Sequence, residues 1–316
     1  MAQKLSSLRD LVRVAAIDIG TNSTRLLIAE TDGASVTREI TRQTTITRLG
    51  RGVSDTKILQ KDRVDSTLQT IEEYYKKARG ENVDQITAVT TSATREAQNA
   101  HVFLEQAKRI LNFMPSIISE DEEASLGYTG VLSDPKIREM GSAFLVIDIG
   151  GGSTEIIFGD KTTPTTMKSY PLGSVRLFET FFESDPPPSR DIGTLQLHIR
   201  RVLESGLDAS LGAQVVPIAV AGTACTLAAV MLALETYDPK RVHLSDLTYD
   251  NVLELLDKFA SLPLPQREKL TGIEPGRADV IIAGTALLSE IMDYFGLKHV
   301  TVSERDLLDG MVLSVK

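Results

Sequence analysis

Residues Val146–Phe158 read Val-Ile-Asp-Ile-Gly-Gly-Gly-Ser-Thr-Glu-Ile-Ile-Phe: an apolar strand that ends in an acid, a turn of three glycines followed by hydroxyl side chains, and a second apolar strand. Glycines adopt positive φ without a steric penalty and leave no Cβ over the turn, so its N–H groups can approach an anion. Asp148 precedes the turn, where a carboxylate can hold a divalent cation against a bound phosphate. Taken alone, the motif is also compatible with an ordinary hairpin that has a glycine-rich turn.

The same pattern occurs earlier, in residues Ile17–Ile28, which read Ile-Asp-Ile-Gly-Thr-Asn-Ser-Thr-Arg-Leu-Leu-Ile. A shift of 130 positions places Asp18 on Asp148 and apolar residues on apolar residues. Two copies of the unit predict two similar halves that face each other, and two phosphate loops at one cleft suit a polyanionic substrate. The copies differ at Arg25, whose counterpart is Glu155. The second copy therefore has a second carboxylate, and we place the metal site there.

Length and composition limit the class of protein. The 316 residues are enough for two domains, and a net charge of −9 argues against a general nucleic-acid-binding surface. The single cysteine, Cys225, excludes an intrachain disulfide framework and fits a cytoplasmic location. No apolar signal segment opens the chain. The uncharged stretch 211–234 is divided by Pro217 and Gly222, which favours a buried strand and helix over a membrane span.

Three polar segments have both structural and functional interpretations. Arg48–Val53, with two arginines and two glycines, has the composition of a solvated turn. Arg95 falls in the first turn of a helix predicted from Ser92 onward, where the helix dipole disfavours a cation; it is either exposed or paired with an anion. The acids of Glu120–Glu123 are typical of a solvated helix start. At a hinge between two halves, however, one of them can accept a proton from a water that attacks a phosphate.

The segment Ala221-Gly222-Thr223-Ala224 follows a predicted strand and precedes a predicted helix, so its amides are placed to bind an anion. Strands alternate with helices along the chain, and the unit occurs twice. This pattern predicts an α/β protein with two related domains that flank a cleft. We expect the first domain to span residues 1–124 and to be completed by a C-terminal helix at 303–316. The second domain is expected to span residues 125–302.

Together these motifs resemble the exopolyphosphatase and guanosine pentaphosphate phosphohydrolase (Ppx/GppA) family, which belongs to the superfamily of sugar kinases, Hsp70 and actin. The resemblance covers nearly the whole chain. Its motifs occur here, in order, as Asp18–Arg25, Thr91–Asn99, Ile118–Ala124, Asp148–Glu155, Leu172–Leu177, Ala221–Thr223, Gly276–Asp279 and Ser303–Glu304. The resemblance implies two ribonuclease H-like domains of the actin-like ATPase type on either side of an interdomain cleft.

The resemblance also implies roles for individual residues. The family's catalytic base corresponds to Glu123, with Glu122 as the neighbouring alternative, and its essential arginine corresponds to Arg95. Its metal-site acids correspond to Asp148, Glu155 and, from the other half, Asp18. The expected phosphate-binding residues are Asn22, Ser23, Arg25, Gly150, Gly151, Gly152, Ser153, Thr154, Gly222 and Thr223. Glu120 replaces the family's usual glycine, and its charge is expected to raise the pKa of Glu123.

The implied activity is that of an exopolyphosphatase, which hydrolyses the terminal phosphoanhydride of inorganic polyphosphate with Mg²⁺ or Mn²⁺ and a glutamate base. Guanosine pentaphosphate presents the same terminal bond and is the alternative substrate. A kinase of the superfamily would need an adenosine pocket as well, and a non-catalytic nucleotide or polyphosphate sensor would tolerate loss of Glu123. Longer members carry an extra helical domain, so we expect shorter substrates here unless a homodimer supplies the missing surface. No nucleic-acid or membrane partner is expected.

Overall fold

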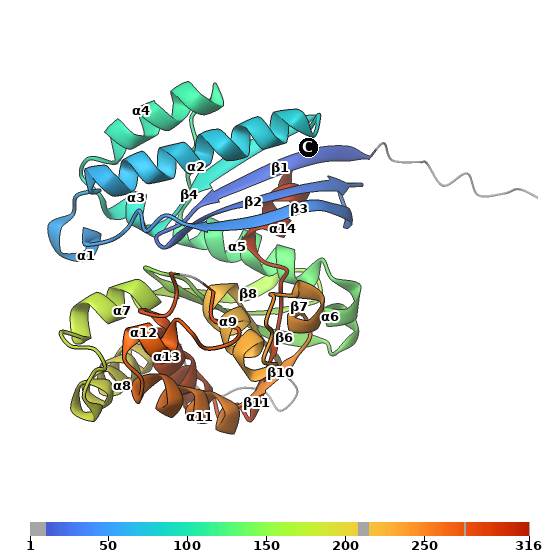
Figure 1. Cartoon of the computed structure of the whole chain (residues 1–316). Helices are drawn as coiled ribbons and strands as arrows, with labels where there is room; N and C mark the ends of the chain where they lie inside the picture. Colours follow the sequence, from blue (N-terminus) through green and yellow to red (C-terminus); the bar gives the residue numbers. More distant parts are fainter. Residues whose placement is uncertain (1–10, 208–214, 275, 316) are drawn as a thin grey trace, which may run out of the picture.

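The computed structural model describes residues 11–207, 215–274 and 276–315, which form two α/β halves, one above the other in Figure 1. The first half contains a mixed sheet with the strand order β3-β2-β1-β4-β5. Strands β1, β2 and β3 form an antiparallel meander, whereas β4 lies parallel to β1 and β5 parallel to β4. The strands are β1 Val12–Ile19, β2 Ser23–Thr31, β3 Val36–Ile46, β4 Gln85–Thr90 and β5 Ser116–Ile117.

The second half contains a sheet with the strand order β10-β11-β9-β6-β7-β8. Here β6, β7 and β8 form the antiparallel meander, β9 lies parallel to β6, and β11 lies parallel to β9. Strand β10 pairs antiparallel with β11 at the edge. The strands are β6 Ala143–Ile149, β7 Thr154–Asp160, β8 Pro164–Tyr170, β9 Val215–Val220, β10 Asp246–Thr248 and β11 His299–Val302.

The two sheets repeat one topology around the two copies of the motif. The β1–β2 hairpin pairs Asp18 with Arg25, and the β6–β7 hairpin pairs Asp148 with Glu155. In each half a parallel strand then joins the first strand on its other side, β4 beside β1 and β9 beside β6. The predicted fold class, α/β with two related halves, is confirmed.

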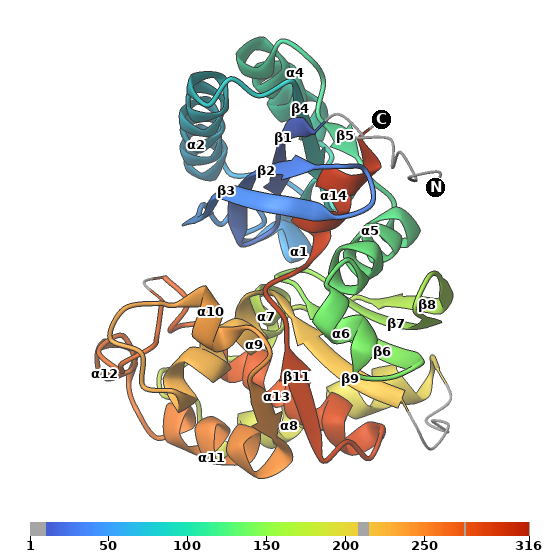
Figure 2. The same cartoon turned by 90° about the vertical axis from the view of Figure 1, so that its right-hand side faces the viewer.

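Helices cover both faces of the first sheet (Figure 2). They are α1 Val53–Thr56, α2 Lys61–Gly80, α3 Ser92–Glu96, α4 Ala100–Leu111 and, from the C-terminus, α14 Leu307–Ser314. Strand β1 is apolar on both sides: Ile17 and Ile19 pack in the cluster of α2 and α4, whereas Val14 and Ala16 pack against α14. Successive side chains of a strand point to opposite faces, so a sheet that is covered on both faces needs such a continuous apolar run.

In the second half, the buried helix α13 packs against α7, α8, α9 and α11 on one face of the sheet. On the other face α5 and α6 place Tyr128 and Ile137 against Phe144 and Val146. The helices are α5 Glu120–Leu132, α6 Pro135–Glu139, α7 Ser174–Phe181, α8 Ser189–Glu204, α9 Ala221–Met231, α10 Pro239–Val242, α11 Tyr249–Ala260, α12 Leu264–Arg267 and α13 Ile281–Tyr294.

Helices α5 and α14 lie where the two halves meet. Figure 2 shows the chain leaving β11 in the second half and rising to α14, which packs on β1 and β2 of the first sheet. The two helices pack backbone to backbone, because a Cβ on Gly310 would overlap the backbone of Leu126 and one on Gly130 would overlap that of Asp306. Residue 124, where the sequence placed the domain boundary, lies inside α5.

The prediction that Arg48–Val53 is a solvated turn is wrong. Leu49 is fully buried, and the N–H of Gly50 donates to the carbonyl oxygen of Thr21 at 2.9 Å, directly under the first loop. Arg48 pairs with Asp279 of the second half at 2.8 Å. The composition was misleading because the two arginines suggest an exposed segment, whereas its single leucine holds it in the core.

The uncharged stretch 211–234 contains β9 and α9 in its described part, as expected from its proline and glycine. Across residues 11–207, 215–274 and 276–315, no helix combines the length and the apolar character needed to cross a membrane.

Candidate active site

A cavity of about 580 Å³ lies between the two halves. Its walls are formed by both glycine loops, by β3, by the start of α9 and by the segment that leads into α14. The predicted site residues that line it are Asp18, Asn22, Ser23, Arg25, Glu123, Asp148, Gly150, Gly151, Gly152, Ser153, Gly222 and Thr223. Arg95, Thr154 and Glu155 do not line it.

The two glycine loops have the same geometry. The N–H of Gly20 donates to the carbonyl oxygen of Ser23 at 2.9 Å, and the N–H of Gly150 donates to that of Ser153 at 3.0 Å. Among the described residues, the N–H groups of Gly151 and Gly152 donate to no protein acceptor. These two amides are therefore available to an anion in the cavity.

The loops also touch each other, and glycine makes this contact possible. A Cβ on Gly152 would lie 2.5 Å from Ser92 Oγ and 3.0 Å from Thr21 Oγ1. A Cβ on Gly151 would lie 3.1 Å from that of Asn22. The absence of side chains at both glycines thus brings the phosphate loop of the second half against the first half.

Carboxylates gather beside the second loop. Burial raises the pKa of Asp148 to about 7, and the charges of Asp306, Glu123 and Asp18 add to the effect. Burial, followed by the charges of Glu123 and Asp148, raises the pKa of Glu155 well above its usual range. Because like charges at close range oppose ionisation, this cluster attracts a cation. Glu155 lies opposite Asp148 in the strand register and accepts a hydrogen bond from Ser169 Oγ at 2.8 Å.

Glu123 faces the cavity from the first turn of α5. Arg95 Nη1 donates to Glu123 Oε2 at 2.7 Å and to the carbonyl oxygen of Ile118 at 2.9 Å. The two side chains are only 14% and 17% exposed, so their ion pair is shielded from solvent. Burial raises the pKa of Glu123, and Arg95 lowers it. Arg95 thus fixes one carboxylate oxygen of Glu123 and leaves the other free.

The helix that carries Arg95 is shorter than predicted. Helix α3 ends at Glu96, and the chain is extended at Ala97 before α4 begins at Ala100. Because α3 has only five residues, Arg95, the fourth, lies in its first turn as expected and also in its last. Its anionic partner is Glu123.

The acids that neighbour Glu123 in α5 differ from it in their surroundings and hydrogen-bond partners. Glu122 completes a capping box: its Oε2 accepts from the N–H of Ser119 at 2.8 Å, while its own N–H donates to Ser119 Oγ at 3.2 Å. Glu120 is exposed. The pKa of Glu123 is raised mainly by burial, and Asp18 is the acid that adds to it, so the expected effect of Glu120 is not its main cause.

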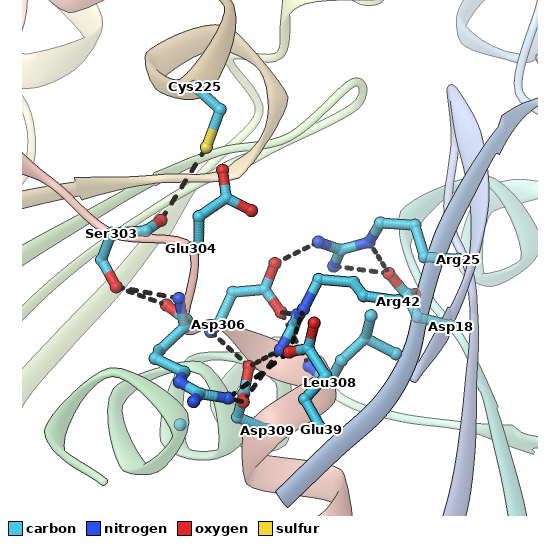
Figure 3. A network of polar contacts seen from close by, with 12 residues as sticks. Asp18, Arg25, Glu39, Arg42, Cys225, Ser303, Glu304, Asp306, Leu308 and Asp309 are labelled. Carbon is cyan, nitrogen blue, oxygen red and sulfur yellow. Dashed lines mark hydrogen bonds and ion pairs between the residues drawn. The ribbon is translucent and has the colours of Figure 1, made fainter. Parts of the chain in front are cut away.

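An ionic network that the sequence did not predict joins the first loop to the C-terminal segment (Figure 3). Arg25 Nε donates to Asp18 Oδ2 at 2.8 Å, and Arg25 Nη1 donates to Asp306. Arg42 Nη2 donates to both carboxylate oxygens of Asp309 at 2.9 Å. The sequence pointed to this segment through the family motif at Ser303–Glu304, the departure from the family at Arg305-Asp306 and the expected helix at 303–316, but it gave these acids no role.

Gly222 and Thr223 line the cavity at the start of α9, as expected for an anion site. The space beside them is already occupied by a cation, because a Cβ on Gly222 would overlap the guanidinium of Arg277. Arg277 itself lines the cavity and pairs with Glu274. The helix start and Arg277 together provide positive potential at this part of the cavity.

The acids at the cavity fit a divalent cation in the manner usual for Mg²⁺. Asp148 lines the cavity without a hydrogen bond or ion pair to any described residue, and both amide atoms of Asn22 are buried without a hydrogen-bond partner there. Within this part of the chain, no three His, Cys, Asp or Glu side chains form a ready ligand set. Mg²⁺ is commonly held by one or two carboxylates together with substrate phosphates and water, so a complete protein cage is not required.

Comparisons with known proteins agree with this geometry. The model of the Ppx/GppA phosphatase family matches residues 27–316. Exopolyphosphatase 2 of Mycobacterium tuberculosis is 34% identical over 325 residues, which cover 96% of this chain and 99% of the relative. The solved Ppx/GppA family member of Aquifex aeolicus superposes with a TM-score of 0.80 at 34% identity, covering 96% and 97% of the two chains. A solved exopolyphosphatase-like protein superposes with a TM-score of 0.90 at 30% identity, with the same coverage.

The two-sheet fold and these matches define a phosphatase built on the actin-like ATPase fold. The chain belongs to the Ppx/GppA phosphatase family, as its motifs predicted, and it is a hydrolase that acts on phosphoanhydrides. The kinase alternative therefore has no support.

Proposed function

We propose that this protein is an exopolyphosphatase that removes the terminal phosphate of inorganic polyphosphate by hydrolysis. The observation that carries the proposal is the convergence of Glu123, Asp148 and the free amides of Gly151 and Gly152 on one cavity. The substrate is supported by the name of the Mycobacterium tuberculosis relative, which matches along nearly the whole of both chains.

In the proposed reaction, a water beside Glu123 attacks the terminal phosphorus while its proton passes to the Glu123 carboxylate. The P–O bond to the next phosphate breaks, orthophosphate is released, and the bridging oxygen leaves as the new terminal oxyanion of the shortened chain. Arg95 holds Glu123 Oε2, which orients the other oxygen toward the water. The amides of Gly151 and Gly152 stabilise the charge on the transferred group.

We further propose Mg²⁺, or Mn²⁺, as the cofactor, with Asp148 at the cavity wall as its principal ligand. Glu155 lies opposite Asp148 in the strand register, and Asp18 is the candidate acid from the first half. When bound, the ion neutralises charge on the terminal phosphate. It also relieves the repulsion that raises the pKa of Asp148.

Guanosine pentaphosphate is the second candidate substrate. The cavity continues from the phosphate loops to Leu234, Tyr237 and Ile273, whose apolar surfaces adjoin Arg277. Apolar walls beside phosphate-binding groups are typical of nucleoside pockets. A non-catalytic sensor would use the same surfaces without releasing phosphate.

Phosphate release tests the proposal, with Mg²⁺ and with long-chain polyphosphate, short polyphosphates, guanosine pentaphosphate and ATP compared in parallel. Glu123→Gln is expected to lose roughly a hundred- to ten-thousand-fold in rate, the usual weight of general-base catalysis. Glu122→Gln is the matched control, because this neighbouring acid is occupied by the helix cap, and it is expected to keep the rate within a few-fold. Full activity of Glu123→Gln excludes the proposed base, and a preference for the nucleotide identifies the second substrate.

We propose in addition that two copies associate and that the protein acts in the cytoplasm without nucleic-acid or membrane partners. The net charge of −9 supports the absence of a nucleic-acid partner. Light scattering after size-exclusion chromatography tests the oligomeric state, since a monomeric mass excludes the homodimer.

A further inference from the structure

The first glycine loop has its own cation. Arg25 occupies the register position opposite Asp18, where the second half has Glu155 opposite Asp148. Arg25 Nε and Nη2 lie 2.8 and 2.7 Å from Asp18 Oδ2. One hairpin therefore presents an acid paired with a guanidinium, whereas its counterpart presents two acids with no cation of their own.

Arg25 is held in this place from the far end of the chain. Its Nη1 donates to Asp306, whose other oxygen accepts from the N–H of Leu308 at 2.9 Å and caps α14 (Figure 3). Arg42 flanks the same carboxylate at 3.8 Å and is itself fixed by Asp309. A guanidinium held by two charged partners in a shielded site keeps one geometry.

The same pairing bears on Asp18. Its Oδ2 is used by Arg25, and its Oδ1 is buried without a partner among the described residues. A divalent cation at Asp18 would lie beside the guanidinium and would be repelled by it. Asp148 has Arg25 only as a nearby charge and forms no ion pair with any described residue, so it stays free for a metal.

We propose that Arg25 takes the place of a metal ion in the first half. It neutralises Asp18, directs fixed positive charge at the substrate phosphates, and restricts divalent-cation binding to the Asp148 side. Asp18 is then a positioning residue for Arg25 and not a metal ligand. The inference rests on the proposed metal-dependent function of the same cavity.

Counting the Mn²⁺ that binds in the presence of inorganic phosphate tests this assignment without turnover, because the phosphate supplies the ligands that a substrate would give. Calorimetry and the electron paramagnetic resonance signal of free Mn²⁺ give the stoichiometry for the wild type, Arg25→Glu and Arg25→Gln. The wild type and Arg25→Gln are expected to bind one ion per chain. Arg25→Glu reproduces the acid pair of the second half and is expected to bind a second ion. Equal numbers of bound Mn²⁺ ions in Arg25→Glu and Arg25→Gln would overturn the proposal. Two ions in the wild type and one in Asp18→Asn would also overturn it.

Two further measurements keep the test decisive. If Arg25→Glu does not fold, the double variant Arg25→Glu with Asp306→Asn replaces it. The second substitution removes one repelling charge, and the asparagine can still cap α14. This variant is also expected to bind a second Mn²⁺ ion. Failure of the proposed function is distinguishable: a wild type that binds no Mn²⁺ yet releases phosphate refutes the metal site at Asp148. Even in that case, the role of Arg25 is supported if Arg25→Glu binds one Mn²⁺ ion more than Arg25→Gln does.

Discussion

The β1–β2 and β6–β7 hairpins have the same turn, the same register and the same acid before the glycine, yet they differ in charge. The first pairs Asp18 with Arg25, and the second pairs Asp148 with Glu155. Burial raises the pKa of the acid in both hairpins, but the first is neutral by itself, whereas the second gathers negative charge. A repeated fold has thus acquired two different electrostatic roles, one that supplies positive charge and one that attracts it.

The largest expected difference between the halves is in catalysis. Asp148→Asn removes the principal metal ligand and is expected to lower the rate of phosphate release by roughly a hundred- to a thousand-fold, as for loss of a group that stabilises charge in the transition state. Asp18→Asn removes one ion-pair partner of Arg25 and is expected to lower the rate of phosphate release about ten-fold. This is the lower end of the range for loss of an outer-shell partner. Steady-state rates at saturating Mg²⁺ measure both. Equal losses would mean that the two acids have equivalent roles.

The contact between the loops can be broken by one methyl group. In Gly152→Ala the new Cβ would lie 2.5 Å from Ser92 Oγ at the start of α3 and 3.0 Å from Thr21 Oγ1 of the first loop, which pushes the second loop away from the first half. We expect a loss of about ten- to a hundred-fold in phosphate release, because a displacement of roughly 1 Å at reacting groups has that effect. Gly193→Ala, in the open middle of α8, is the control and should leave the rate unchanged. An unaffected Gly152→Ala would show that the loops act independently.

The charge difference also predicts how stability depends on pH. Since the pKa of Asp148 is raised to about 7, the folded protein binds its proton more tightly than the unfolded chain does. The stabilisation from this proton is complete at pH values below the ordinary aspartate pKa and is lost as the pH rises toward 7, by up to about 1.4 kcal/mol per pH unit.

Urea unfolding with a chelator measures this effect. The free energy of unfolding of the wild type, relative to that of Asp148→Asn, is expected to fall between pH 5 and pH 7.5. Mg²⁺ added at the higher pH should restore it in the wild type alone. A difference that does not change with pH would contradict the raised pKa.

The smallest expected effect concerns the helix that presents Glu123. Ser119→Ala removes the oxygen that caps α5 and is expected to lower the free energy of unfolding by about 1 kcal/mol. Thermal or urea unfolding measures the loss, and phosphate release should fall by much less than in Glu123→Gln. A loss of activity as large as that of Glu123→Gln would show that the cap also positions the base.

The features that could be predicted from the sequence are those formed by residues close together in the chain. The two loops, their flanking strands and the acid at the start of α5 each occupy a few consecutive residues, and their patterns are visible without a fold. The partners of the arginines are not local: Arg25 and Asp306 are 281 positions apart, and Arg42 and Asp309 are 267 apart. Only the return of the chain to the first half at α14 brings them together.

Burial was the other property that the sequence did not reveal. Leu49 lies in the core although it stands among arginines and glycines. Glu155 was predicted as a metal-site acid from its motif; it lies opposite Asp148 in the strand register and is buried, but it does not line the cavity. The motif gives the residue type, and the twist and packing of the strands decide which side chain reaches the cavity.

The most direct test of the charge difference between the halves is the position of the metal. Anomalous diffraction from crystals soaked in Mn²⁺ and phosphate locates the ion against the two hairpins. The charge difference predicts one peak beside Asp148, with Arg25 still paired to Asp18. A peak coordinated by Asp18, with Arg25 displaced, would contradict it.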